Sequence, residues 1–244
     1  MQNQGGPVRR SPTGRIPQWA MDEAIRTHRT VFPQAPPPPS SSADLLLTAP
    51  GAAARSRAVE LTVGHPFRST LARFLGVRRP EHSWQAGARG EELVARELAR
   101  LGHPWTVLHS VPVGRRGSDI DHVVLGPAGV FTLNSKHHRG ARIRVDGDRV
   151  WVNGQYQHYV RNSRHEANRA ARLLSAAVGF PVPAQGVVVP VGAAAFDVRR
   201  QPVDVQVVNR ARIRRWLSGQ PRVWSDAQLA LVVQVARSSA TWVR

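Results

Sequence analysis

The chain has 244 residues, no cysteine, and a formal net charge of +18, from 34 Lys plus Arg against 16 Asp plus Glu. The absence of cysteine excludes disulfide scaffolds, cysteine-ligated zinc sites and thiol catalysis. The length predicts one folded domain with an extension. No apolar run approaches the ~20 residues that span a bilayer, and no apolar signal segment follows Arg9 and Arg10. We therefore expect a soluble, cytoplasmic protein without a membrane span.

The excess of positive charge predicts attraction to polyanions, with nucleic acid first and an anionic membrane surface second. Lys136 is the only lysine among the 34 basic residues, and the other 33 are arginine. GC-rich coding explains much of that ratio. A lysine that persists in such a composition indicates a position where the bulk and fixed charge of arginine do not substitute, with chance survival as the alternative.

Residues 1–80 are expected to form a basic, Pro/Ser-rich and mostly disordered extension. Its tract QAPPPPSSS at 34–42 favours polyproline II structure and solvated serines. Two short helices are predicted within it, over 19–30 and 68–75. The folded domain is predicted over 84–244, and its parts are a motif core at 84–200 and C-terminal helices at 210–244.

Regular patterning begins with a helix over 87–101, indicated by the apolar spacing of Val94, Leu98 and Leu101. Short apolar runs between turn sequences then predict a meander of strands at 105–111, 120–125, 130–135, 141–145, 149–152 and 156–160. Ser163 and Glu166 have the spacing of a capping box, which predicts that a second helix starts there. The remaining predictions are strands at 186–189 and 203–208 and helices at 211–217 and 225–242. This order predicts an α/β or α+β sandwich.

Charged and amide side chains fall where two neighbouring strands of the meander would meet. Asp119 and Asp121 enter one strand, and Asn134 and Lys136 end the next. Because side chains alternate along a strand, each pair shares a face. The turn GPAG at 126–129 would make the two strands antiparallel neighbours. A carboxylate, an amide oxygen and an ammonium are therefore expected close together.

That trio fits metal-assisted hydrolysis of a phosphodiester. Mg²⁺ takes hard oxygen ligands, usually one or two carboxylates together with water and phosphate oxygens. The ion polarises the phosphoryl group and lowers the pKa of a bound water, while a nearby lysine steadies the developing charge. Glu91, near the start of the first helix, is a further candidate carboxylate. The alternative readings are a solvated helix face for Glu91 and a turn-forming role for Asp121.

The order G-x-x-G-E on a helix, then D-I-D-H-V-V-x-G-P-x-G-V-F, then a strand ending in x-x-K resembles the nuclease-related domain (NERD) family. That family is assigned to the PD-(D/E)xK nuclease-like superfamily, and the resemblance covers roughly residues 84–200. It implies a restriction-endonuclease-like sandwich, with a central mixed sheet flanked by helices. It also implies a nuclease that depends on Mg²⁺ or Mn²⁺.

By position, the resemblance implies that Glu91 and Asp121 bind the metal ion and that Lys136 is the lysine of the motif. Asn134 stands where the superfamily has its acid. An amide oxygen can still ligate Mg²⁺, but without negative charge it predicts weaker metal affinity and weaker water activation. The segment around Asn162 resembles the family's Asn-containing segment before a helix, and Glu166 stands there where a glutamine is common.

Basic and imidazole groups near this site are candidate contacts to nucleic acid. They are Arg115, Arg116, His137, His138, Arg139 and Arg161. Trp151, Tyr156 and Tyr159 fall inside predicted strands, so we expect them to pack in the sheet and not to stack on bases.

Three functions remain open from the sequence. The first is a metal-dependent nuclease acting on nucleic acid, with DNA favoured over RNA. The second is a nucleic-acid-binding module of the same fold whose catalysis is weak or lost through Asn134. The third is a basic interaction or tethering protein that acts through residues 1–80.

Overall fold

A computed structural model describes residues 42–51, 80–113 and 118–243 of the chain, without the side chains of residues 80–86. Most of the predicted extension, including both of its predicted helices, lies outside the described residues. So does the hairpin tip that carries Arg115 and Arg116.

A five-stranded mixed sheet lies at the centre of the molecule, in the order β1-β2-β3-β7-β9. Its strands are β1 (Thr106–Val113), β2 (Ser118–Gly126), β3 (Gly129–His137), β7 (Ala184–Val191) and β9 (Val205–Val207). The first three pair antiparallel, whereas β3, β7 and β9 pair parallel. The predicted α/β class with a central mixed sheet is confirmed.

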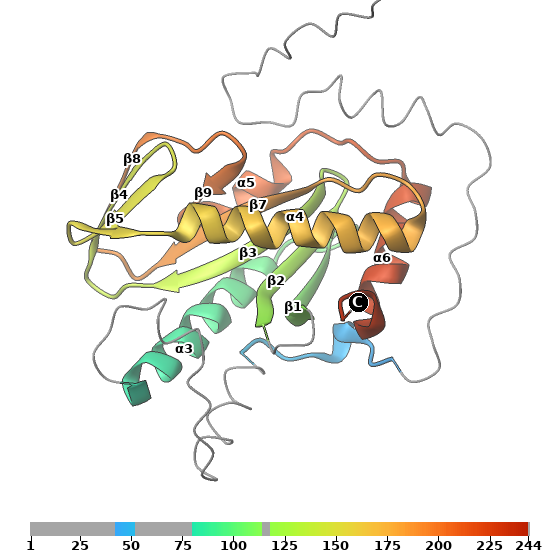
Figure 1. The fold of residues 1–244 in the computed structure, drawn as a ribbon, viewed down its shortest axis with the longest axis horizontal. Helices are drawn as coiled ribbons and strands as arrows, with labels where there is room; N and C mark the ends of the chain where they lie inside the picture. The colour runs from blue at the N-terminus through green and yellow to red at the C-terminus, as the bar shows by residue number, and fades with distance from the viewer. Residues whose placement is uncertain (1–41, 52–79, 114–117, 244) are drawn as a thin grey trace, which may run out of the picture.

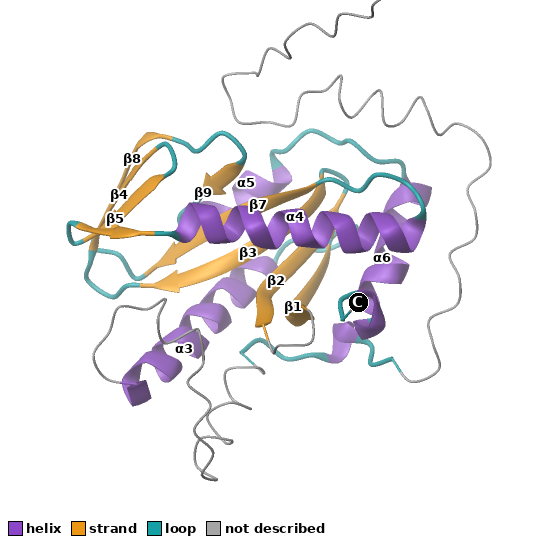
Figure 2. Cartoon of the chain, viewed as in Figure 1, coloured by secondary structure: helices purple, strands orange, loops and turns teal. Residues whose placement is uncertain are grey.

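Helices cover both faces of this sheet (Figures 1 and 2). Helices α4 (Tyr159–Val178) and α6 (Asp226–Arg237) pack on one face, where their apolar side chains meet those of β1 and β2. Helices α3 (Pro80–Leu98) and α5 (Ile213–Ser218) pack on the other, against alternate residues of β3 and β7. The three layers bury a continuous apolar core on each side of the sheet.

The meander leaves the central sheet after β3 and forms a second, four-stranded sheet, in the order β6-β5-β4-β8. Its strands are β4 (Arg142–Asp146), β5 (Arg149–Val152), β6 (Gln155–Gln157) and β8 (Ala195–Arg200). The inner face of this small sheet packs on Tyr159 and Val160 and on β7 and β9. The sequence did not predict β8, whose residues alternate between exposed and only half-buried side chains.

The second helix begins earlier than the capping-box spacing predicts. Helix α4 starts at Tyr159, so Tyr159 and Val160 do not belong to the predicted strand 156–160. Ser163 is 1% exposed inside the helix. A Cβ atom on Gly186 would lie 2.6 Å from its Oγ. The predicted N-cap at Ser163 is wrong, because the helix begins at Tyr159, and the missing Cβ of Gly186 lets α4 approach β7 closely at Ser163.

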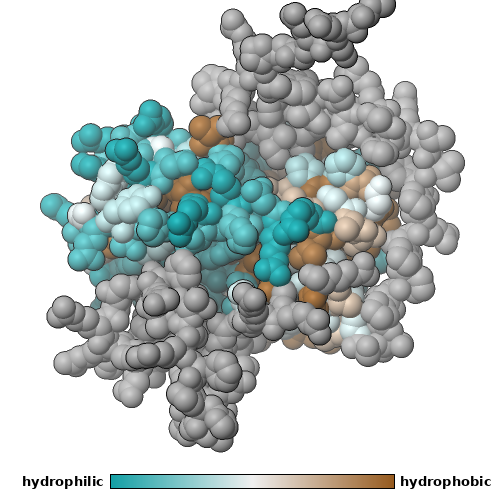
Figure 3. Space-filling view, in the orientation of Figure 1, coloured by the Kyte–Doolittle hydropathy of each residue, from teal (hydrophilic) through white to brown (hydrophobic). Residues whose placement is uncertain are grey.

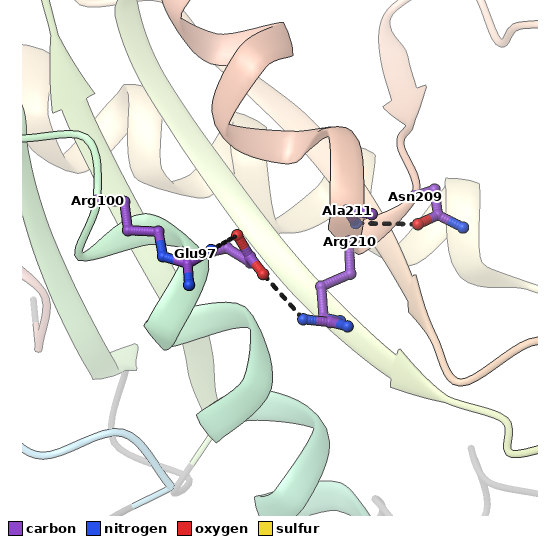
Figure 4. A network of polar contacts seen from close by, with 5 residues as sticks. All are labelled: Glu97, Arg100, Asn209, Arg210 and Ala211. Carbon is purple, nitrogen blue, oxygen red and sulfur yellow. Dashed lines mark hydrogen bonds and ion pairs between the residues drawn. The ribbon is translucent and has the colours of Figure 1, made fainter.

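An ion pair joins the C-terminal part of the domain to α3, and a capping box starts its last helix. Glu97 of α3 accepts from Arg100 and from Arg210, each at 3.0 Å, which links α3 to the 3-10 turn Arg210–Arg212 before α5 (Figure 4). Ser225 and Gln228 form a capping box at the start of α6. The predicted final helix, 225–242, stops at Arg237 and is followed by a 3-10 turn over Ser239–Thr241.

Residues 42–51 belong to the folded unit, although they fall within the expected extension. Leu45 is 4% exposed in the core between the sheet and α6. Asp44 forms an isolated bridge with Ser238 and an ion pair with Arg237. This short segment therefore binds the C-terminal end of the domain.

Hydrophilic side chains gather over the small sheet, whereas apolar side chains reach the surface beside α6 (Figure 3). Among the described residues, the structure contains no helix with the length and apolar character to span a membrane.

Candidate functional site

The predicted site residues lie where β2 and β3 diverge. The ladder between these strands runs from Gly126↔Gly129 to His122↔Leu133. Strand β3 continues beside β7 as far as His137↔Val191. The next positions, Asp121 and Asn134, therefore face each other across a fork. The predicted antiparallel arrangement is confirmed, and it places the entry of β2 beside the end of β3.

The Asp121 carboxylate spans this fork. Its Oδ2 accepts a hydrogen bond from the backbone N–H of Ser135 at 2.6 Å. Loss of hydration raises the pKa of Asp121, and the charge of Asp119 adds to that rise. The ammonium of Lys136 and the bonds from Ser135 act in the opposite direction. The carboxylate is thus fixed in position, in surroundings that favour a nearby cation.

Glu91 belongs to α3, on the face of the sheet opposite α4, and it lies near Asp121 and Lys136 at the fork. Gly90 lets α3 approach the end of β3, since a Cβ there would lie 3.0 Å from the Cβ of His137. Burial raises the pKa of Glu91, and the charges of Asp121 and Asp119 raise it further. Glu91 Oε2 is buried without a hydrogen-bond partner among the described residues.

Two groups partly offset this unfavourable environment. The ammonium of Lys136 and the backbone N–H of Gly51 both lower the pKa of Glu91. The hydrogen bond from Gly51 shows that the segment 42–51 extends from the C-terminal end of the domain to the site.

Asn134 is 8% exposed, and its amide is held by α4. Its Nδ2 donates to Oε1 of Glu166 at 2.9 Å and to Oε2 at 3.1 Å. Within the described part of the chain, its Oδ1 is buried and has no hydrogen-bond partner. Burial raises the pKa of Glu166 to about 7, against the lowering effects of Lys136 and of the Asn134 bond.

Lys136 is the cationic centre of the cluster. Its charge acts on Glu91, Asp121 and Glu166. Its Nζ lies 5.4 Å from the ring centroid of Tyr159, close enough for a cation–π contact. One ammonium therefore shares a site with three carboxylates.

A chain of imidazoles supports the Asp121 side of the fork. His122 is fully buried, and its Nδ1 lies 2.8 Å from Nδ1 of His109. Its Nε2 lies 3.5 Å from Oγ of Ser135, the residue that binds Asp121. Burial lowers the pKa of His122 to about 3, so its ring is neutral at physiological pH.

The predicted nucleic-acid contacts are dispersed. His138 bonds Tyr159, with its Nε2 2.8 Å from the hydroxyl oxygen, and burial is the main cause that lowers its pKa to about 4. His137 is half-buried beside Gly90, and Arg139 and Arg161 are exposed. Arg115 and Arg116 lie outside the described residues.

The aromatic side chains of the small sheet differ from the expectation of internal packing. Tyr156 is 49% exposed, and the guanidinium of Arg144 lies 4.6 Å from the ring centroid of Trp151. Trp151 and Tyr156 are cross-strand partners, so both rings share the outer face of the sheet. Only Tyr159 is buried, as expected.

The sequence did not assign Glu166 to the site. The buried side chains of α4 recur at Ser163, Ala167 and Ala170, and Glu166 is adjacent to that stripe. The resemblance of the segment around Asn162 to the family was one available signal, and a charged residue beside the buried face of a helix was another. The capping-box reading obscured it. No comparable signal in the sequence points to Gly51.

The donor set fits a hard divalent cation held partly by water. Glu91 and Asp121 offer carboxylates, and Asn134 offers an amide oxygen that has no partner among the described residues. In the described part of the chain, no three His, Asp or Glu side chains form a group that could hold a metal ion. Mg²⁺ and Mn²⁺ suit such a site, because Mg²⁺ commonly uses one or two carboxylates and takes its other oxygens from water and phosphate.

The fold and the site define an α/β domain with carboxylates gathered around one lysine at a fork in a mixed sheet. Residues 86–191 match the model of the nuclease-related domain (NERD) family, in agreement with the resemblance of the sequence motifs. No curated protein and no solved structure matches the chain.

Proposed function

We propose that the domain is a nuclease that hydrolyses phosphodiester bonds, dependent on Mg²⁺ or Mn²⁺, with DNA the favoured substrate and RNA the alternative. The observation that carries this proposal is the convergence of Glu91 and Asp121 on Lys136 at the fork of β2 and β3. The family match supports a nuclease-related activity. A cytoplasmic location, where nucleic acid is accessible, is part of the same proposal.

Each residue has a distinct role in this proposal. Glu91, Asp121 and Oδ1 of Asn134 would hold the ion, which supplies polarisation of the phosphate and a more acidic water. Lys136 neutralises charge that develops on the phosphate oxygens, as a compact cation can. The backbone N–H of Ser135 keeps the Asp121 carboxylate in place.

Two exposed regions are suited to the nucleic-acid backbone. Arg139 and Arg161 follow the end of β3 and the start of α4, next to Lys136 and Tyr159. The outer face of the small sheet presents Arg144 over Trp151. Positive side chains beside aromatic rings are typical of surfaces that bind single strands without sequence preference.

The test is cleavage of a supercoiled plasmid and of a labelled single strand, with Mg²⁺, with Mn²⁺ and with EDTA. Asp121→Ala should lower the cleavage rate by about 100-fold or more, because a principal metal ligand is lost. Asp226→Ala is the matched control, since Asp226 lies at the start of α6 and pairs with Arg222 at the surface. Cleavage that survives Asp121→Ala would place the activity elsewhere.

A second candidate function is nucleic-acid binding without turnover. The neutral amide of Asn134 favours it, because it leaves only two carboxylates among the three proposed ligands. It predicts binding whose affinity falls steeply with salt, in proportion to the phosphates contacted. Asp121→Ala should then leave DNA affinity unchanged, and no cleavage should appear with either metal ion. The tethering alternative concerns residues 1–80, most of which lie outside the described residues, and deletion of residues 1–41 tests it without removing the folded segment 42–51.

A further inference from the structure

We propose that Glu166 is a positioning residue of the metal site, which orients and polarises Asn134 so that the amide oxygen acts as a metal ligand. The inference rests on the proposed function, because it concerns the same ion. It adds a residue of α4 to a site otherwise formed by α3, β2 and β3.

The hydrogen bonds fix the orientation of the Asn134 amide. A carboxylate only accepts, and the amide nitrogen only donates, so contact with Glu166 at 2.9 and 3.1 Å identifies Nδ2 as the atom that faces α4. The carbonyl oxygen must then lie on the side of the amide away from Glu166. That oxygen is buried, in a residue 8% exposed, and has no partner among the described residues.

An unpartnered buried acceptor is unfavourable unless a cation or donor satisfies it. Asp121 occupies the position opposite Asn134 across the fork, and Lys136 follows two residues later on the same face of β3. The unpartnered Oδ1 of Asn134 therefore belongs to a residue beside Asp121, whose charge repels that of Glu91. A divalent cation bound at this point would satisfy the amide oxygen and would neutralise the repulsion between the two carboxylates.

The charge of Glu166 reaches the proposed ion through the amide. An amide that donates to an anion carries more negative charge on its oxygen, because hydrogen bonds in series polarise one another. Glu166 also interacts with Lys136 and Asp121 directly. The carboxylate of α4 therefore compensates for the neutral side chain on β3.

The structural alternative makes Glu166 a simple partner for Lys136 and Asn134. Under that alternative, the Glu166→Gln variant would change the free energy of unfolding without changing metal affinity. Under the proposal, Glu166→Gln weakens metal binding by about 10- to 100-fold, the usual effect of removing a group that orients a ligand.

The decisive experiment is a charge exchange in the full chain. Mn²⁺ affinity is measured by the electron paramagnetic resonance signal of the free ion, for wild type, Glu166→Gln, Asn134→Asp and the double variant. The double variant carries the carboxylate on β3 and the amide on α4, with the same net charge. We expect Glu166→Gln to bind Mn²⁺ more weakly than wild type, and the double variant, which places a carboxylate on β3, to recover most of the lost affinity. Glu97→Gln, which alters a carboxylate paired with Arg100 and Arg210, is the control.

The outcomes separate this inference from the proposed function. If Glu166→Gln binds Mn²⁺ as wild type does while Asp121→Ala does not, the role of Glu166 is wrong and the metal site stands. If the double variant binds no better than Glu166→Gln, the exchange fails and the inference is likewise overturned. If wild type binds no Mn²⁺, the proposed function falls together with the inference. Thermal unfolding in EDTA verifies that each variant is folded.

Discussion

Gly90 of α3 lies against His137 of β3, so close that a Cβ on the glycine would be 3.0 Å from that of the histidine. This contact lets the helix approach the end of the strand. It also brings the next residue, Glu91, within reach of Asp121 and Lys136. A backbone approach of this kind fixes the position of one carboxylate relative to the others.

We expect Gly90→Ala to lower the free energy of unfolding by about 1–3 kcal/mol, because the added methyl group must displace α3 or β3. Gly87 is the matched control, since a Cβ there would meet no described atom within 4 Å. Gly87→Ala should raise the free energy of unfolding by up to about 1 kcal/mol through helix propensity. Urea denaturation measures both. Equal effects of the two substitutions would show that the approach at Gly90 is not restrictive.

Stability without metal should depend on pH through Glu91. Burial and the neighbouring carboxylates raise the pKa of Glu91 from 4.5 to about 9 in the folded state, so the folded protein keeps a proton that the unfolded chain has lost. The free energy of unfolding should therefore fall as pH rises between these values, by up to about 1.4 kcal/mol per pH unit. Between pH 7.5 and 8.5 Glu91 should dominate this slope, because the pKa of Glu166 is about 7.

Glu91→Gln provides the comparison for that slope. Thermal unfolding in EDTA should show a melting temperature that decreases from pH 7.5 to 8.5 in wild type and much less in the variant. Added Mn²⁺ should reverse the decrease in wild type, since the ion replaces the proton. A slope that persists in Glu91→Gln would assign the linked proton to another group.

Lys136→Arg should lower the cleavage rate by at least about 10-fold, and Lys136→Gln by about 100- to 1000-fold, the effect of removing one donor to a developing oxyanion. The ammonium lies 5.4 Å from the ring centroid of Tyr159 and its charge acts on three carboxylates, and a planar guanidinium with its charge spread over a larger group does not reproduce that compact cation. Single-turnover cleavage at saturating Mg²⁺ is the measurement. Full activity of the arginine variant would mean that the lone lysine persists by chance.

Leu45→Ala should lower the free energy of unfolding by about 2–4 kcal/mol, because it removes a buried side chain from the core. Leu47, two residues further on, is 86% exposed, and Leu47→Ala should change stability by less than about 0.5 kcal/mol. Chemical denaturation of the full chain compares the two. Similar effects would indicate that the segment 42–51 does not contribute to the folded unit.

Local periodicity was sufficient to predict most of the central elements. The alternation along β2 and β3, together with the turn at 126–129, correctly places Asp121 and Lys136 at one end of neighbouring strands. Those features depend on residues close in sequence, where side-chain spacing and turn chemistry decide the structure.

Contacts between distant residues were not predictable in the same way. Strand β8 pairs with β4, about fifty residues earlier, and carries little apolar signal of its own. The spacing of Ser163 and Glu166 is typical of a helix N-cap, but Ser163 is buried against Gly186, a contact that no local pattern shows. Glu166 joins the site only because α4 crosses the sheet over Asn134. Tertiary packing decides each of these cases.

The anchored segment ending at Gly51 has a practical consequence for dissecting the chain. A fragment that starts at α3 would lack both the leucine that fills the core and the N–H that binds Glu91. Loss of cleavage in such a fragment would report a damaged domain and would say nothing about recruitment by the preceding residues. Truncation after residue 41 keeps both contacts, and so isolates what the remaining upstream sequence contributes.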